Sequence, residues 1–86
     1  MYNYRLVDEG KDIISGETED FMEIYYILDE SGAYKVGADI VIQKPLENGE
    51  ECLTSVIAPE VHKLQLTILE MYASMRRKLN NKESVQ

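Results

Sequence analysis

The stretch "VHKLQLTILEMYASMRRKLNN", residues 61–81, decides the fold that the sequence predicts. At 100° per residue, most of its apolar side chains fall in one arc of roughly 100°, which is wide enough to cover a small sheet. Pro59 suits the start of such a helix, because its missing N–H costs nothing there. Asn80 and Asn81 can supply a C-cap. The arc, called here the core stripe, consists of Val61, Leu64, Ile68, Met71, Tyr72, Met75 and Leu79.

The same helix has more apolar surface than one core-facing stripe requires. One interpretation is that the surplus packs under a loop or the N-terminal strand of the same chain. The other is that it contacts a second copy or a different protein, because exposed leucines flanked by arginine are typical of contact surfaces. A two-fold dimer is the simplest form of the second, and Leu69→Asp would then favour the monomer. The surplus consists of Leu66, Leu69 and Ala73, rimmed by His62, Arg76 and Arg77.

Upstream of residue 61, the pattern is one of short strands. The segment 21–29, "FMEIYYILD", is compatible with a helix or a strand. It is rich in Tyr and Ile, and the turn-like "DESG" joins it to the clean alternation of 33–43, so we interpret it as a strand paired with its successor. The segments with strand patterns are residues 2–7, 13–16, 21–29, 33–43 and 52–57.

These segments together predict an α+β fold. We expect a small antiparallel sheet of three to five strands, arranged as a meander and packed by one long C-terminal helix. A chain of 86 residues has no room for two cores. We therefore expect a single domain over residues 1–81 and a polar tail over 82–86.

A sheet covered by one helix leaves its other face open. On the expected strand 21–29, the side chains of Met22, Ile24, Tyr26 and Leu28 would point toward the helix. The alternate side chains would point outward, where aromatic groups are common at binding surfaces. They could equally bury cross-strand neighbours. This outward set, which we add to the candidate interface, consists of Phe21, Tyr25 and Ile27.

The charge is distributed unevenly along the chain. Residues 1–60 hold 14 acidic and 4 basic side chains, whereas residues 61–86 hold 2 acidic and 5 basic ones. The acidic part disfavours contact with a phosphate backbone and promotes solubility. It could also imitate the field of a nucleic acid inside a basic groove. The acids expected on that surface are Asp8, Glu9, Glu17, Glu19, Asp20, Glu47, Glu50 and Glu51.

Residue types that carry chemistry are few. Cys52 and His62 lie ten residues apart with no third group to orient them. One Cys and one His do not form a zinc site, and "ETED" at 17–20 lacks the spacing of a calcium loop. No phosphate-binding glycine motif is present. We therefore expect no enzymatic activity, no catalytic residues, no cofactor and no metal.

The remaining features concern location and partners. The single Cys fits a reducing cytosol, and the sequence shows neither a membrane-spanning run nor a signal-peptide pattern in residues 1–10, so we expect a cytoplasmic protein without a membrane partner. The cations of 76–78, "RRK", suit the end of a helix and its dipole.

The sequence thus favours a small acidic protein-binding module that acts by occupying a partner's surface. Inhibitors, anti-repressors and adaptors of phages and mobile elements have this character, and nucleic-acid mimicry is one variant of it. We expect a protein partner, and a homodimer. The first alternative is a structural homo-oligomeric accessory subunit. The second is a nucleic-acid binder that uses paired basic helix ends.

Overall fold

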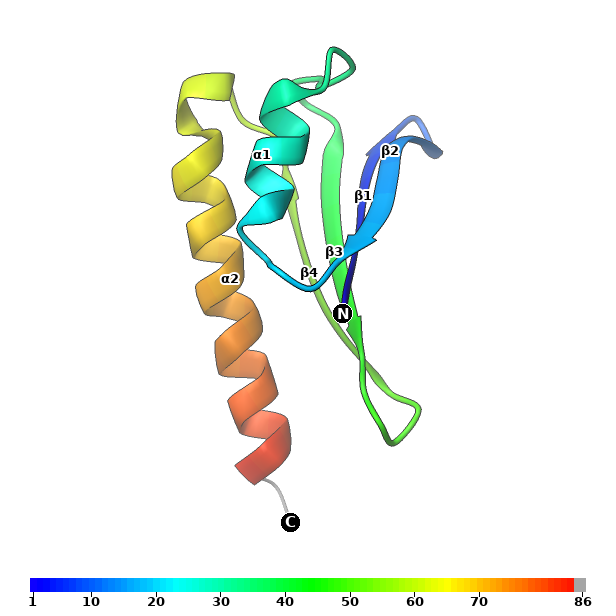
Figure 1. The fold of residues 1–86 in the computed structure, drawn as a ribbon, viewed down its shortest axis with the longest axis vertical. Coiled ribbons are helices and arrows are strands. Elements are labelled where there is room, and N and C mark those ends of the chain that lie inside the picture. The colour runs from blue at the N-terminus through cyan, green and yellow to red at the C-terminus, as the bar shows by residue number, and fades with distance from the viewer. Residues whose placement is uncertain (85–86) are drawn as a thin grey trace.

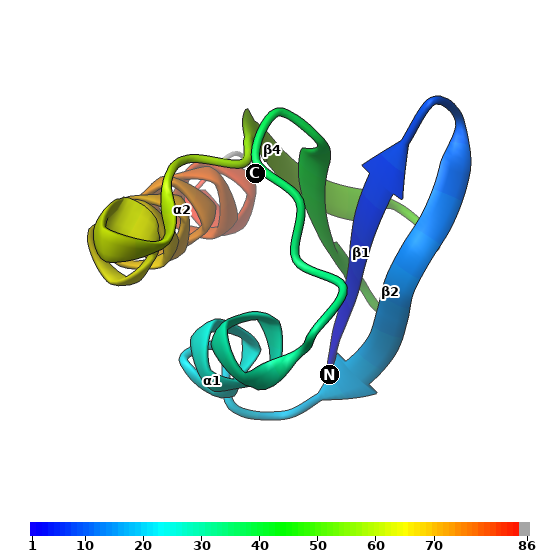
Figure 2. The same ribbon diagram turned by 90° about the horizontal axis from the view of Figure 1, so that it is seen from above.

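The computed structural model describes residues 1–84, with side chains described through residue 81. Four strands form one antiparallel sheet, and two helices lie side by side on the same face of it (Figures 1 and 2). Within residues 1–84, no helix covers the other face. The elements are β1 (Tyr2–Asp8), β2 (Lys11–Thr18), α1 (Glu23–Glu30), β3 (Asp39–Pro45), β4 (Glu51–Ile57) and α2 (Val61–Ser84). The predicted α+β class, with a long C-terminal helix packed on a small antiparallel sheet, is confirmed.

The strand order is β2-β1-β3-β4, with every neighbouring pair antiparallel. Glu9 and Gly10 join β1 to β2, and both have positive φ angles, 51° and 78°. Two such residues make the tight turn whose twist suits a hairpin. The chain then crosses from β2 to β3 through α1, so β1 lies in the middle of the sheet beside β3.

The interpretation of residues 21–29 as a strand is wrong, because this segment forms α1. Its entry is stabilised by polar side chains: the Thr18 hydroxyl oxygen accepts a hydrogen bond from Asp20 N–H at 3.1 Å, and Asp20 Oδ1 accepts one from Met22 N–H at 3.0 Å. These contacts fix the turn just before α1, whose first N–H, from Glu23, donates to the Asp20 carbonyl at 3.0 Å. Ile24 and Leu28, four residues apart, then bury one face of the helix.

The neighbouring prediction of a strand over 33–43 is correct only in its second half. Residues 33–38 form turns and loop, and β3 begins at Asp39. Gly37, inside the segment predicted as a strand, is a loop residue with a φ of 92°. The alternation persists into the loop because Tyr34 is partly buried against the core and Ala38 is buried, without either being paired in the sheet.

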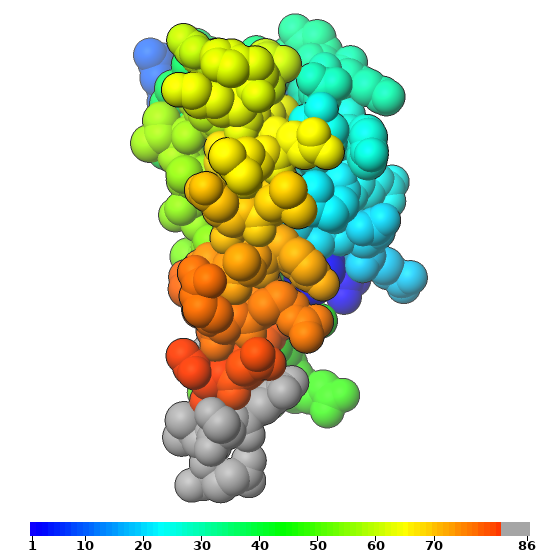
Figure 3. Space-filling view, turned by 90° about the vertical axis from the view of Figure 1, so that its left-hand side faces the viewer, coloured from blue at the N-terminus to red at the C-terminus, as the bar shows by residue number. Residues whose placement is uncertain are grey.

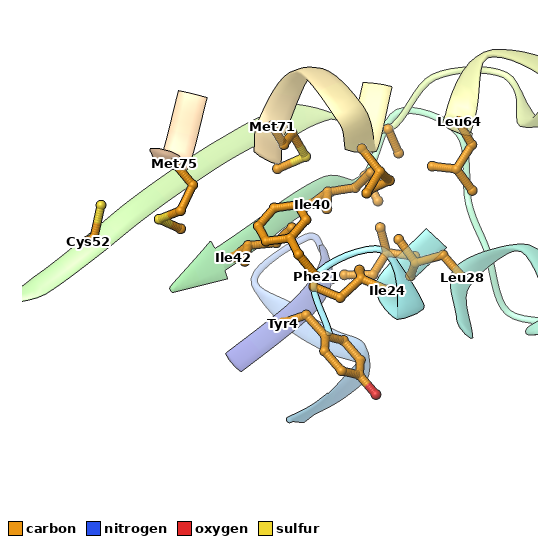
Figure 4. Close-up of a cluster of buried hydrophobic side chains, with 14 residues drawn as sticks. Tyr4, Phe21, Ile24, Leu28, Ile40, Ile42, Cys52, Leu64, Met71 and Met75 are labelled. Atoms are coloured by element: carbon orange, nitrogen blue, oxygen red, sulfur yellow. The ribbon is translucent and has the colours of Figure 1, made fainter. Parts of the chain in front are cut away.

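The core lies between the sheet and the two helices (Figure 4). From the core stripe of α2, Leu64, Ile68 and Met75 are completely buried, whereas Val61 is 51% exposed and does not belong to the core. The helix extends to Ser84, past the expected C-cap and three residues into the expected tail, and residues 85–86 lie outside the described part. The buried apolar residues are Tyr4, Leu6, Phe21, Ile24, Leu28, Ala38, Ile40, Ile42, Cys52, Ala58, Leu64, Ile68, Met71 and Met75.

The loop between α1 and β3 is tied to the junction between β4 and α2. The Tyr34 hydroxyl donates a hydrogen bond to the Pro59 carbonyl at 2.6 Å, and Gly37 N–H donates one to the Ala58 carbonyl at 2.9 Å. Burial raises the pKa of the Tyr34 phenol above its ordinary value of 10.0. The fold therefore favours the neutral, hydrogen-bonded phenol.

Tyr34→Phe is expected to lower the free energy of unfolding by about 1 kcal/mol, the typical net value of one hydrogen bond. Because the folded-state pKa is raised, the contribution of the neutral phenol is complete below pH 10 and is lost as pH rises through the folded pKa. The variant should therefore lose less stability than the wild type above pH 10. Urea unfolding between about pH 7 and pH 11 measures both effects, and parallel pH curves for the two proteins would contradict this assignment.

Candidate interaction surface

The outer stripe, Leu66, Leu69 and Ala73, lies on the side of α2 turned away from the core. Counting 100° per residue, it is roughly 150° from the side that carries Leu64 and Ile68. Leu66 is 62% exposed and Leu69 is 45% exposed, and Ala73 is also exposed. Within the described residues, neither a loop nor the N-terminal strand covers them. Figure 3 looks onto this face, with α2 running down the middle and α1 beside it.

Basic side chains border the outer stripe. Arg76 and Arg77 are exposed and follow Ala73 by one turn, on opposite flanks of the stripe by their helical positions. His62 is exposed at the other end, where its Nε2 lies 3.5 Å from Glu60 Oε2. The surface is therefore apolar along its middle and cationic at its C-terminal end.

Lys78 does not share the orientation of the two arginines. Its ammonium group donates a hydrogen bond to the Leu53 carbonyl in β4 at 2.6 Å. The three cations of 76–78 also do not occupy the last turn, because α2 continues to Ser84. The interpretation of this basic run as a dipole-stabilising helix end is therefore wrong, and one of its members attaches the helix to the sheet.

The aromatic part of the predicted interface is not on the open face of the sheet. Phe21 is 3% exposed and lies in the core, with its ring 5.1 Å from that of Tyr2 and 5.0 Å from that of Tyr72. Tyr25 and Ile27 belong to α1 and are partly buried against the core. The cause is the same error of secondary structure, since a helix turns these side chains by about 100° per residue and a strand by about 180°.

The exposed aromatic residue of α1 is the one that the sequence placed inward. Tyr26 is 56% exposed, and its ring centroid lies 5.1 Å from that of Tyr25. A helical period of about 3.6 would have identified it, because Tyr26 is two residues from both Ile24 and Leu28, which are buried.

The acidic side chains do not form one continuous surface. Asp8 and Glu9 lie at the β1–β2 turn, whereas Glu47 and Glu50 lie at the β3–β4 turn. The register that pairs Val7 with Asp39 and Asn3 with Gln43 places these turns at opposite ends of the sheet (Figure 1).

Several of the acids predicted on this surface have structural partners. Asp8 accepts a hydrogen bond from Lys35 at 2.6 Å. This hydrogen bond and the negative charge of the Asp8 carboxylate raise the pKa of the Lys35 ammonium group. Asp20 stabilises the start of α1. Glu51 accepts a hydrogen bond from Gln43 at 3.1 Å. The others, Glu17 and Glu19, are exposed along and just after β2, near the end of the sheet that carries the β3–β4 turn.

Cys52 and His62 lie in different environments. Cys52 is 1% exposed within the core, near Met75 in Figure 4. His62 is exposed in the first turn of α2. In the part of the chain that the structure describes, no three His, Cys, Asp or Glu side chains gather to hold a metal ion. Neither helix of that part has the length and apolar character needed to cross a bilayer.

Comparison with known proteins returned no match to a protein-family model, a curated protein or a solved structure.

Proposed function

We propose that this protein is a non-enzymatic protein-binding module that attaches another protein to the outer stripe of α2. The observation that carries the proposal is the position of Leu66 and Leu69, which are 62% and 45% exposed on the side of a helix turned away from its buried face. Leucines placed so contribute nothing to the core, but they can bury apolar area against a partner. An inhibitor, an anti-repressor or an adaptor works by occupying a surface in this way.

The charged side chains that border the outer stripe indicate the kind of partner that would bind there. The guanidinium groups of Arg76 and Arg77 would form ion pairs with carboxylates that flank an apolar groove on the partner. A second copy of the chain suits this surface less well. If two α2 helices packed antiparallel with Leu66 against Ala73 of the second copy, the same register would place His62 and Lys63 against arginines. The outer stripe therefore fits a different protein with acidic groups better than the two-fold dimer that the sequence suggested.

The alternatives have less support from the arrangement of charges. Nucleic-acid mimicry needs a continuous row of acids, and here they divide between the two ends of the sheet. Nucleic-acid binding through basic helix ends would depend mainly on Arg76 and Arg77, because Lys78 is bonded to β4. A structural homo-oligomer remains an alternative, and it predicts that the immobilised chain retains no other protein in the capture experiment described below.

The double variant Leu66→Gln/Leu69→Gln is expected to reduce partner binding by at least about tenfold, because it removes the apolar middle of the surface. Its folding stability should stay within about 1 kcal/mol of wild type, since both side chains are exposed. The measurement is quantitative mass spectrometry of proteins retained from an extract of the source cells by immobilised wild type and variant.

The matched control is Ile13→Gln/Val36→Gln, which changes two exposed apolar residues on other parts of the molecule. This control should retain the same protein as wild type, and high salt should reduce that retention only moderately. A partner that binds the outer-stripe variant and the control equally would show that the function resides elsewhere on the molecule.

A further inference from the structure

The two edges of the sheet differ in their protection against pairing with another strand. Edge strands in monomers are usually blunted by charges, prolines or irregular register. The β2 edge has Lys11, Asp12 and Glu17, and its pairing with β1 is irregular at Leu6/Val7. The β4 edge has a regular register along its whole length, and Glu51 at its start is its one charged residue.

The direction of the backbone groups in β4 follows from two hydrogen bonds. Ala58 N–H donates to the Ala38 carbonyl at 2.7 Å, so the backbone groups of residue 58 point toward the β3 side. The carbonyl of Leu53 points the other way, where it accepts a hydrogen bond from Lys78. Because successive residues of a strand point alternately, the N–H and C=O of Leu53, Ser55 and Ile57 face away from β3.

The side chains of the same residues lie on the open face of the sheet. The register of β3 and β4 places Cys52 and Thr54 on the helix-covered face, where both are buried. Leu53 and Ile57 therefore project from the opposite face, and they are 45% and 60% exposed. The β4 edge thus combines outward-facing backbone groups with two exposed apolar side chains.

We propose that a second copy of this chain pairs with β4 across a two-fold axis at Ser55, which joins the two sheets into one continuous sheet. In antiparallel pairing centred on Ser55, Leu53 of each chain lies opposite Ile57 of the other. The strand is thus complementary to itself, because this register forms two equivalent Leu53–Ile57 pairs and buries the exposed apolar side chains of both chains. A register shifted by two residues would set Leu53 against Ser55 or against Pro59.

This pairing is compatible with the hydrogen bond that Lys78 already makes to the β4 edge. Lys78 uses one lone pair of the Leu53 carbonyl, and a carbonyl oxygen can accept a second hydrogen bond, here from Ile57 N–H of the second copy. The outer stripe lies on the far side of α2 from the sheet. The pairing of two β4 strands therefore leaves it accessible, and the proposal does not depend on the proposed function.

Complementary charges test the register. Leu53→Glu and Ile57→Lys should each weaken dimerisation roughly thirtyfold, because the two-fold axis doubles the loss of every cross-strand pair. An equimolar mixture of the two variants should recover dimers, since the pairing sets the introduced carboxylate of one chain opposite the introduced ammonium group of the other. Analytical ultracentrifugation over a wide concentration range measures both effects. Ile13→Lys, at the irregular position of β2 on the other edge of the sheet, is the control and should dimerise as wild type does.

Proline gives a second test that acts on the backbone. Ser55→Pro removes an N–H that faces away from β3, so the monomer should fold while the dimer is lost. The same alternation, followed through β3 and β1, gives Ser15 the equivalent position on the β2 edge, and Ser15→Pro should leave the dimer intact. A wild type that stays monomeric at millimolar concentration overturns the proposal. So does a dimer that survives Ser55→Pro, or a mixture of charged variants that fails to recover.

Discussion

Ile68→Ala is expected to lower the free energy of unfolding by about 2–5 kcal/mol, the range for truncating a fully buried aliphatic side chain. Ile68 has no exposed surface and lies in the middle of the core stripe of α2. The core of an 86-residue chain is small, and total stabilities of such domains are about 5–15 kcal/mol. The variant should therefore unfold at a markedly lower urea concentration, with an unchanged slope.

The adjacent residue provides the control. Leu69→Ala should change the free energy of unfolding by no more than about 0.5 kcal/mol, because Leu69 is 45% exposed and alanine has at least as high a helix propensity. Both variants are compared at low protein concentration, so that self-association does not contribute. Equal losses in the two variants would mean that Leu69 packs within its own chain, and the outer stripe would not be a binding surface.

Gly16→Ala is expected to lower the free energy of unfolding by about 1–3 kcal/mol, the usual effect of overpacking a core. Gly16 lies directly opposite Tyr4 in the pairing of β1 with β2. A methyl group there would lie 2.8 Å from Tyr4 Cζ and would also meet the Tyr4 hydroxyl oxygen. The Tyr4 side chain is buried, so it has little room to move away.

A double-mutant cycle separates this steric cause from a loss of backbone flexibility. In a Tyr4→Leu background, Gly16→Ala should cost much less or become neutral, with a coupling energy of at least about 1 kcal/mol. Gly32→Ala is the control for the glycine itself, because Gly32 has nothing within 4 Å of an added Cβ. If the losses in free energy of unfolding caused by Tyr4→Leu and Gly16→Ala are additive, the close packing of Tyr4 over Gly16 is not the reason that position 16 requires glycine.

The helix α2 could be predicted from sequence because its core stripe and its outer stripe both extend over several turns. Leu64, Ile68, Met71 and Met75 repeat over three turns, and all of them are buried. The surplus of Leu66 and Leu69 followed from the same periodicity, and the structure shows both exposed. Over such a length, one period fits and others do not.

The segment 21–29 could not be assigned correctly because it is too short for its period to be decisive. Residues such as Tyr and Ile favour strands in general, but their environment overrides that preference. Here the contacts of Thr18 and Asp20 start a helix, and β1 takes the place beside β3 that a strand over 21–29 would have needed. The prediction that Phe21, Tyr25 and Ile27 lie on the open face of the sheet is wrong for the same reason.

The sequence by itself determined the α+β class, the long C-terminal helix, its buried side and its surplus apolar stripe, because each depends on periodicity within one continuous segment. Only the tertiary structure decided which strands are neighbours and which strand forms an open edge. Strand order depends on contacts between segments far apart in the chain, and β4 becomes an edge only once β1 has taken the centre of the sheet. The surface proposed for a second copy, from Leu53 to Ile57, therefore has no signature in the sequence, whereas the surface proposed for a partner does.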